Sequence, residues 1–228
     1  MIYFSCLACS TQKFNLVFLV DGSGSIEHQG SGNFQRSKDF IIGLVRNFDI
    51  GRDEVNVATV LFWHSYRIVH RLNTYYSEQS VEAAIQAMSY PAGGTRTGQG
   101  LNVIRNEIFD NLGADRDILP KIVIVLTDGL STDDVVGPAQ ALRDLGVTII
   151  SVGVGCCFYR AELNAMASDP DEDHVYEASF ADLQQITGSL RKQICLGKEM
   201  HLASQLMSSS SLHHVAFVDT CTRTHMTT

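Results

Sequence analysis

Three stretches of the chain are predominantly apolar, the third with Thr148 and Ser151 inside it, and each one ends in a polar or glycine-containing turn. They are Leu16–Val20, Ile122–Leu126 and Val147–Val152. An uninterrupted apolar run of this length, bounded by turn residues, is typical of a strand buried on both faces of a parallel sheet. Val55–Phe62 is also rich in β-branched residues and adds a fourth strand. Tyr66–Leu72 follows it after only three residues, and so short a connection predicts an antiparallel pair at the sheet edge.

Between these strands the apolar positions recur at helical spacing. The pattern in Asn33–Phe48 predicts an amphipathic helix. Ser77 is expected to cap the start of another helix, and Pro91 to end it. Strands that alternate with helices predict an α/β fold: a doubly wound, mostly parallel sheet with one antiparallel edge strand and helices on both faces, as in Rossmann-like proteins. The other expected elements are a helix after Thr95–Gly98, helices over Ser131–Leu145, Arg160–Ala167 and Phe180–Ile194, and a strand over His174–Tyr176.

This pattern divides the chain into three regions. Residues 1–13 precede the first strand and are interpreted as a truncated signal peptide or a linker, since Met1–Ser10 is apolar but lacks a basic start. Residues 14–195 form the predicted α/β domain. Over residues 196–228 the periodicity fades and Ser208–Ser211 is of low complexity, so we interpret this region as a disordered tail or the start of a missing region.

The composition is that of an ordinary globular protein. Of 228 residues, 45% are hydrophobic and 18% are charged, enough for one α/β domain with a sizeable core. The formal net charge is -8 and the isoelectric point is about 5.4, which argues against nucleic acid or an anionic membrane as the main partner. No apolar run approaches the roughly 20 residues that span a bilayer.

Oxygen-bearing side chains gather where the strands end. Asp21, Ser23 and Ser25 follow the first buried strand, separated by glycines that allow a tight turn. Asp128 follows the strand that ends at residue 126, and Thr95 lies in a glycine-rich stretch before a helix. Because ligands bind at the carboxyl ends of parallel strands, we expect these five residues to converge there. Two carboxylates and three hydroxyls suit a hard cation such as Mg2+, which takes about six oxygen ligands and commonly keeps some water.

The three segments together resemble the von Willebrand factor A (vWA) domain and its metal-ion-dependent adhesion site (MIDAS). That family combines a DxSxS turn, a distant threonine in a glycine-rich loop and an aspartate in a TDG turn, and all three occur here in the same order. The resemblance covers roughly Phe14 to Cys195, which is most of the chain. It implies the doubly wound vWA fold.

The resemblance also implies a role for each residue of the site. Ser23 and Ser25 would ligate the metal directly, Thr95 directly or through water, and Asp21 and Asp128 largely through water. An open position on Mg2+, or on Mn2+ or Ca2+ in its place, would accept a carboxylate from a partner protein. The implied function is a metal-dependent protein-binding module for adhesion or matrix interaction, and not an enzyme.

Within the vWA family, the stretches NLVFLVDGSGSI and GGTRTGQGL are similar to those of matrilins, collagen VI-type chains and integrin α-subunit inserted domains. This similarity implies a secreted protein of the extracellular matrix. It also implies that the partner is an extracellular-matrix or cell-surface protein presenting a carboxylate, and that the chain can be part of a larger multidomain protein.

Six cysteines bear on the cellular compartment. Cys9 precedes the first strand and Cys195 ends the last helix, so a disulfide between them would join the two ends of the domain and indicate an oxidising compartment. Free thiols in a cytosolic protein are the alternative. Two further cysteines form the pair Cys156-Cys157 at a position where the vWA family more often has small or polar residues. A vicinal disulfide, two free thiols, or pairing with Cys6 or Cys221 are all open.

The sequence gives weaker support to other functional classes. The stretch Gly153-Val154-Gly155 lacks the third glycine of a dinucleotide fingerprint and follows a late strand. No sequence context supplies a histidine base for Ser23 or Ser25 as a nucleophile. The alternatives that stay open are an intracellular vWA scaffold domain in a protein complex, a metal-dependent hydrolase on the same edge, and a zinc cluster in the tail from His213, His214, Cys221 and His225.

Overall fold

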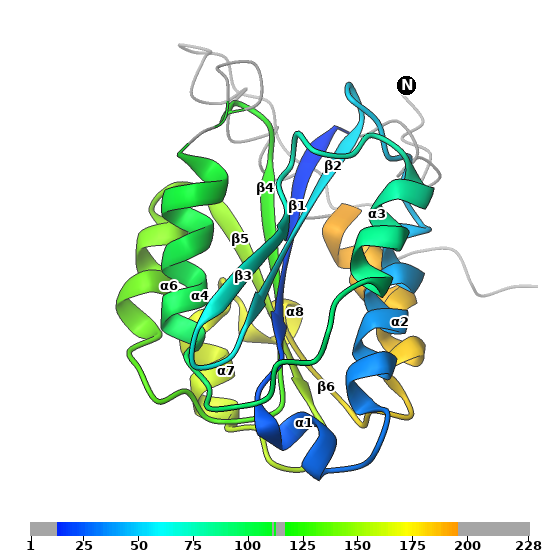
Figure 1. Ribbon diagram of the computed structural model, residues 1–228. Coiled ribbons are helices and arrows are strands. Elements are labelled where there is room, and N and C mark those ends of the chain that lie inside the picture. Colours follow the sequence, from blue (N-terminus) through cyan, green and yellow to red (C-terminus); the bar gives the residue numbers. More distant parts are fainter. Residues whose placement is uncertain (1–12, 111, 113–116, 196–228) are drawn as a thin grey trace, which may run out of the picture.

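The computed structural model describes residues 13–110, 112 and 117–195. They form three layers, with one sheet between two layers of helices (Figure 1). The sheet has six strands in the order β3-β2-β1-β4-β5-β6. All neighbouring strands are parallel except β2 and β3, which are antiparallel. The predicted fold class is therefore confirmed, including the antiparallel edge strand. The strands are β1 Phe14–Asp21, β2 Val55–Phe62, β3 Tyr66–His70, β4 Lys121–Thr127, β5 Val147–Val154 and β6 Val175–Ala178.

The central strand, β1, is buried along its whole length. Its side chains alternate between the two faces of the sheet, as the pleat of a strand requires. Phe18 and Val20 belong to the hydrophobic cluster on one face, and Val17 and Leu19 to the cluster on the other. Both faces are covered by helices, which explains why the strand is apolar at consecutive positions instead of alternating.

Helices cover both faces of the sheet (Figure 1). One hydrophobic cluster includes residues of α1, α2, α3 and the helical residues 187–195, and the other includes residues of α4, α6 and α7. The helices are α1 Gly24–His28, α2 Asn33–Val45, α3 Glu78–Gln86, α4 Thr97–Val103, the π-helix Ile104–Phe109, α6 Val136–Arg143, α7 Arg160–Met166, α8 Asp171–His174 and the 3-10 helix Leu183–Ile186.

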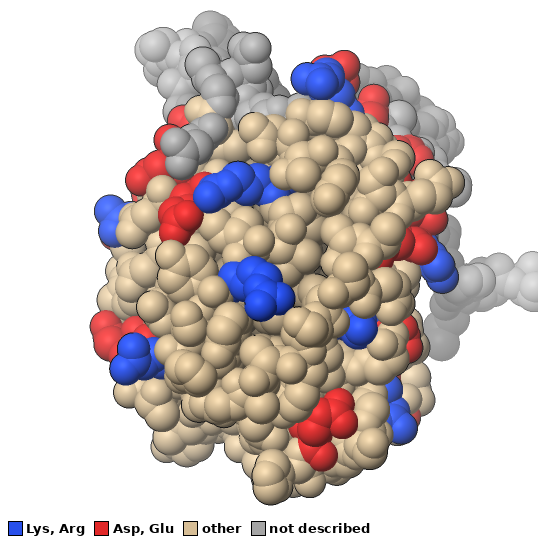
Figure 2. All heavy atoms as spheres, viewed as in Figure 1, with Lys and Arg blue, Asp and Glu red and all other residues tan. Residues whose placement is uncertain are grey.

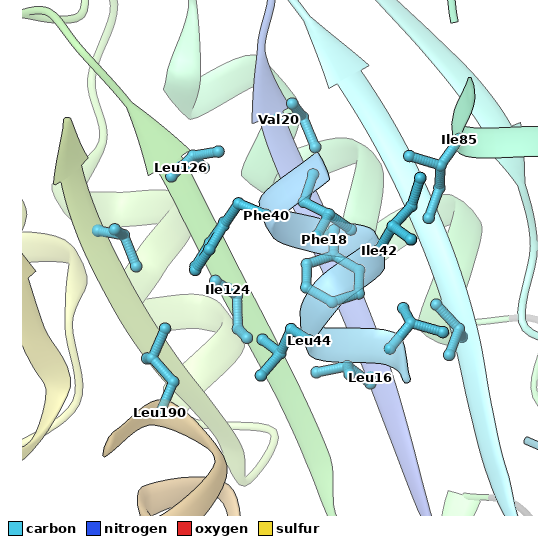
Figure 3. Packing of buried hydrophobic residues seen from close by; sticks show 14 of the residues in the cluster. Leu16, Phe18, Val20, Phe40, Ile42, Leu44, Ile85, Ile124, Leu126 and Leu190 are labelled. Atoms are coloured by element: carbon cyan, nitrogen blue, oxygen red, sulfur yellow. The ribbon is translucent and has the colours of Figure 1, made fainter. Parts of the chain in front are cut away.

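The larger of the two clusters fixes α2 against the sheet. Figure 3 shows Phe40 and Leu44 of α2 set among strand residues such as Phe18 and Ile124. All four side chains are at most 1% exposed. Burial of side chains of this size contributes roughly 1.5–3 kcal/mol each. The cluster therefore holds α2 in a fixed position on this face of the sheet, and with it the α1 turn that precedes it.

Two predicted helices begin later than expected. The helix predicted from Ser131 begins at Val136, and the helix predicted from Phe180 starts as a 3-10 turn and becomes α-helical at residues 187–195. The predicted cap of α3 is confirmed, because Ser77 Oγ accepts a hydrogen bond from Ser80 N at 3.3 Å.

The predicted regions at the two ends of the chain fall largely outside the described residues. Of the predicted segment 1–13, the structure describes Lys13, and the predicted tail 196–228 with its candidate zinc ligands lies outside the described ranges. The boundaries of the domain therefore stay predictions. Among the residues that the structure does describe, no helix has the length and apolar character needed to cross a membrane.

Candidate metal centre

The adjacent ends of β1 and β4 bring two of the predicted segments together. The two strands are parallel, and Val20 lies opposite Leu126 in the register. Asp21 and the Thr127–Asp128 turn follow directly, so they emerge at the same edge of the sheet. α1 begins immediately beyond this edge, and its first turn carries Ser25. The sequence separation of more than a hundred residues between the two turns is thus closed by strand pairing alone.

Asp21 is held by burial and by two hydrogen bonds, with 1% of its surface exposed. Its Oδ1 accepts a hydrogen bond from Ser23 N at 2.7 Å, and its Oδ2 accepts one from Thr127 Oγ1 at 2.7 Å. Burial raises the pKa of Asp21 to about 6, although both hydrogen bonds act in the opposite direction. The carboxylate is therefore fixed in one orientation at an electrostatic cost that a nearby cation would offset.

A chain of hydrogen bonds joins the two serines to the second carboxylate. Ser23 Oγ lies 2.9 Å from Ser25 Oγ, and Ser25 Oγ donates to Asp128 Oδ1 at 2.6 Å. Burial raises the pKa of Asp128, while the hydrogen bonds that it accepts lower it. Together with the bond from Ser23 N to Asp21, these contacts gather four of the five predicted ligands into one cluster.

Thr95 reaches the same edge through the backbone of its loop. The residue is 8% exposed, and its carbonyl oxygen accepts hydrogen bonds from Thr132 N at 2.9 Å and from Thr132 Oγ1 at 2.7 Å. The loop is tied to the start of α1, because Gly24 N donates to Gly93 O at 2.8 Å. The fifth predicted ligand is thus held beside the serine turn by contacts on both sides of its loop.

Three residues that support the cluster were not predicted as part of it. Gln29, at the end of α1, donates from Nε2 to Asp128 Oδ2 at 2.6 Å. The Tyr90 hydroxyl donates to Ser23 O at 2.8 Å, and Thr127 Oγ1 donates to Asp21. Thr127 stands inside the TDG turn and could have been recognised from it. For Gln29 and Tyr90 no local pattern distinguishes them from ordinary surface residues.

The atoms that converge here are hydroxyl and carboxylate oxygens. In the described part of the chain, no group of three or more His, Cys, Asp and Glu side chains is placed to hold a metal ion. The chemistry of the site therefore differs from that of a zinc centre built on nitrogen and sulfur ligands. Hard oxygen donors with two carboxylates fit Mg2+, Mn2+ or Ca2+.

The structure narrows the alternatives for the cysteines. Cys195 is disulfide-bonded. Its predicted partner, Cys9, lies outside the described residues, so the predicted pairing stays a prediction. Cys156 and Cys157 are exposed free thiols, which selects one of the states that the sequence left open.

This arrangement can be compared with known families. The model of the von Willebrand factor type A domain matches residues 15–189. The chain belongs to this family. The resemblance seen in the DxSxS, threonine and TDG segments is therefore confirmed, and the vWA domain accounts for most of the described structure.

Relatives of this vWA domain are matrix proteins. It is 37% identical to the collagen alpha-1(XII) chain of Notophthalmus viridescens over 193 residues, which make up 84% of this chain and 20% of that one. It is 33% identical to matrilin-1 of Gallus gallus over 199 residues, 86% of this chain and 40% of that one. The chain thus spans less than half the length of these relatives. They are secreted extracellular-matrix proteins, which confirms the predicted localisation and leaves the intracellular alternative without support.

Solved structures show the same fold. The structure of proximal thread matrix protein 1 from the mussel byssus has a TM-score of 0.75 at 30% identity and covers 81% of this chain and 47% of that one. Another structure of that protein, with a zinc-occupied MIDAS motif, has a TM-score of 0.75 at 28% identity over 82% of this chain and 49% of that one. Manganese-loaded TRAP protein of Plasmodium vivax shares the fold, with a TM-score of 0.64 at 20% identity over 77% of this chain and 72% of that one.

Proposed function

We propose that this vWA domain is a metal-dependent protein-binding module of the extracellular matrix, and not an enzyme. The observation that carries the proposal is the hydrogen-bonded cluster of Asp21, Ser23, Ser25 and Asp128 at the carboxyl edge of the sheet, with Thr95 held beside it. The zinc-occupied MIDAS motif of the mussel byssus protein supports a divalent cation at the equivalent place.

The donor set assigns distinct tasks to the residues. Ser23 and Ser25 would ligate Mg2+, or Mn2+ or Ca2+, through their hydroxyl oxygens, and Thr95 directly or through water. Asp21 and Asp128 would act mainly through water and orient the serines by the bonds described above. When bound, the cation supplies Lewis acidity for an anionic ligand, because neutral hydroxyls leave much of its charge uncompensated.

The direction from which a partner approaches follows from the burial of the cluster. Asp21, Ser23 and Asp128 are at most 1% exposed, whereas Ser25 is half-buried. An incoming group therefore meets the cluster on the Ser25 side. A carboxylate is the expected group, since it is the hard anionic side chain that proteins present to such cations.

The charged side chains on the face seen in Figure 2 do not suggest a competing mode of recognition. Figure 2 shows acidic and basic side chains interspersed over the face in view, without a broad field of one sign among the described residues there. With a net charge of -8, the chain would also repel an acidic partner at long range. Attraction of a carboxylate thus depends on the cation at the cluster. The expected partner is an extracellular-matrix or cell-surface protein with an accessible Asp or Glu.

The metal is tested by thermal unfolding of the full chain in EDTA and in Mg2+, Mn2+ or Ca2+. Cation at about 100 times its dissociation constant should stabilise the fold by about 2.7 kcal/mol. For a domain of this size that is roughly 5–11 °C in Tm. Ser23→Ala should lose this shift, and Ser31→Ala, which removes an exposed serine from the nearby loop, should keep it. An equal shift in both variants would contradict the proposed site.

The carboxylate is tested separately with Mn2+ as the bound ion. Water-proton relaxation reports water molecules on Mn2+, so a ligand that displaces one lowers the enhancement. A short blocked peptide with a single Glu should lower it, and the same peptide with Gln in that place should not. Equal behaviour of the two peptides would leave a metal site without the proposed carboxylate recognition.

A further inference from the structure

A pair of neighbouring thiols lies next to the candidate metal centre. Cys156 and Cys157 follow β5 after one residue, and both are exposed and free. Their thiols interact with each other, and the hydrogen bond between them raises the pKa of Cys157. The charge of Asp128 acts on Cys157 in the same direction, which places the pair within electrostatic reach of the metal cluster. Nothing in the proposed function uses these thiols.

Gln29 connects the thiol pair to the cluster. Its Oε1 accepts hydrogen bonds from Cys156 N at 2.9 Å and from Cys156 Sγ at 3.4 Å, while its Nε2 donates to Asp128 Oδ2 at 2.6 Å. The opposite orientation of the amide would set Oε1 against the carboxylate and two N–H donors against each other, so the contacts fix the orientation. Gln29 is therefore a bridge with one end on Cys156 and the other on Asp128.

The backbone before the thiols is shaped around this bridge. Gly155 has φ of +82°, and a Cβ at this position would lie 2.1 Å from Gln29 Oε1. A side chain here would be strained by the backbone conformation and would have to displace the amide oxygen of Gln29. The close approach shows that Gln29 is seated in the loop, and is not a surface side chain that happens to touch it.

We propose that Cys156 and Cys157 are a site of thiol–disulfide exchange with small-molecule disulfides, and that their oxidation weakens cation binding by releasing Gln29 from Asp128. This inference rests on the proposed metal site. The Cys156 thiolate attacks glutathione disulfide, forming a mixed disulfide and releasing one glutathione thiolate. The Cys157 thiolate then attacks Cys156 Sγ and releases the second. Overall, two protein thiols are oxidised to one vicinal disulfide, and one glutathione disulfide is reduced to two molecules of glutathione.

The vicinal disulfide removes one end of the bridge. Cys156 Sγ no longer carries a hydrogen to donate to Gln29 Oε1, and closing a small ring through the 156–157 peptide reorients the loop around that oxygen. Gln29 then no longer holds Asp128 Oδ2 in place. Loss of a residue that orients a metal-binding side chain commonly reduces metal affinity 10- to 100-fold. We expect the Mg2+ dissociation constant to rise by about this factor.

The experiment compares Mg2+ affinity of the full chain, by calorimetric titration, before and after incubation with glutathione disulfide. Peptide mass spectrometry should show that the Cys156–Cys157 peptide has lost two hydrogen atoms, and the dissociation constant should rise about 10- to 100-fold. Excess reduced glutathione should reverse both changes. The Cys156→Ser/Cys157→Ser double variant should bind Mg2+ equally before and after treatment.

A separate variant tests whether Gln29 transmits the effect of oxidation to Asp128. Gln29→Met keeps the length of the side chain without its hydrogen bonds. In this variant Cys156 and Cys157 should be oxidised normally, but the Mg2+ affinity should no longer change on oxidation. Gln35→Met, on the exposed side of α2, is the matched control and should respond as the wild type does. Unfolding in EDTA checks that each variant is folded.

Three results would overturn the inference. If the pair is oxidised and the Mg2+ dissociation constant is unchanged, oxidation is not coupled to metal binding. If the pair stays reduced in excess glutathione disulfide, it is not a site of thiol–disulfide exchange. If the reduced wild type binds no Mg2+, the proposed function itself fails together with the coupling. The mass measurement then still reports the thiol chemistry on its own.

Discussion

Replacement of Asp21 by asparagine is expected to stabilise the metal-free protein while abolishing its response to metal. Asp21 is buried beneath the serine turn, where Ser23 N and Thr127 Oγ1 donate to its carboxylate. Asparagine keeps the size of the side chain and one carbonyl acceptor but carries no charge. The substitution therefore separates the cost of burying a charge from the packing of the side chain.

The magnitude follows from the pKa of Asp21, which burial raises from 3.8 to about 6. Because the folded protein binds this proton more tightly than the unfolded chain, ionisation of Asp21 lowers the free energy of unfolding as pH rises through 6. A difference of about 2 pKa units corresponds to about 3 kcal/mol. At pH 7.5 in EDTA, Asp21→Asn should be more stable by up to this amount, or roughly 6–12 °C in Tm. The advantage should shrink as pH falls through 6 and vanish near pH 4.

The assay is chemical denaturation of wild type and variant in EDTA between pH 4 and 7.5, repeated in Mg2+ at pH 7.5. Saturating Mg2+ should raise wild-type stability by about 2.7 kcal/mol at about 100 times the dissociation constant and leave Asp21→Asn unchanged, so the two proteins become nearly equal. Asp39→Asn, at an exposed position, is the control and should change stability by less than about 0.5 kcal/mol. If Asp21→Asn is less stable than wild type in EDTA at pH 7.5, charge burial is not the dominant cost and the reasoning fails.

Three further substitutions test the fold by denaturant unfolding. His70 is buried against Thr59 Oγ1 at 3.0 Å, and burial lowers its pKa from 6.5 to about 4, so the unfolded chain takes up the proton first as pH falls. Wild type should therefore lose about 2 kcal/mol relative to His70→Gln between pH 7.5 and pH 5, and parallel profiles would refute this. Arg143 Nη1 donates to three carbonyl oxygens at the end of α7, so Arg143→Ala should cost about 1–3 kcal/mol, with partial rescue by Lys. Gly98→Ala would place a Cβ 1.8 Å from Asp134 O and should cost about 3 kcal/mol; an unchanged denaturation midpoint would show that the loop simply moves.

The sheet could be predicted from the sequence because its strands satisfy one simple condition. A strand covered by helices on both faces must be apolar at consecutive positions, and Leu16–Val20 and Ile122–Leu126 show this directly. The edge strand was predicted for a different reason, since the three residues between β2 and β3 permit only an antiparallel pair. Both arguments need only local sequence, and both were confirmed.

The start of α6 could not be predicted from local sequence, because two of the polar residues before it bond to another helix. Asp133 accepts hydrogen bonds from Gly98 N and Gln99 N at 2.9 Å, at the beginning of α4. A serine and two aspartates before an apolar stretch look like a helix start when read along the chain. Here Ser131 and Asp133 accept from backbone donors of α4, and only Asp134 accepts from donors of α6, at Val136 N and Gly137 N. α6 therefore starts only at Val136. Which helix these polar residues bond to is decided by tertiary contacts, and a short sequence pattern does not reveal them.

The distinction between local pattern and tertiary contact also applies to the metal cluster: its ligands follow a local pattern, but the residues that position them do not. The five predicted ligands lie in three short segments with recognisable spacing, so the sequence was sufficient to name them, although their metal binding stays a prediction. The contacts that position them cross long distances in the chain. Gln29 and Asp128 are 99 residues apart, and Tyr90 and Ser23 are 67 apart. Such contacts depend on the sheet register and on loop conformations, which only the folded structure supplies.

The two carboxylates of the cluster are held by different supporting contacts. Asp21 is bonded by groups of its own turn and of β4, at a depth where solvent does not reach it. Asp128 is bonded by Ser25 and by Gln29, and Gln29 in turn by the exposed loop at Cys156. A cation would offset the cost of the buried charge at Asp21, whereas the proposed chemistry of the surface thiols acts on Asp128 through Gln29. The vWA domain can therefore keep its fold unchanged while the strength of its metal site is adjusted from the surface.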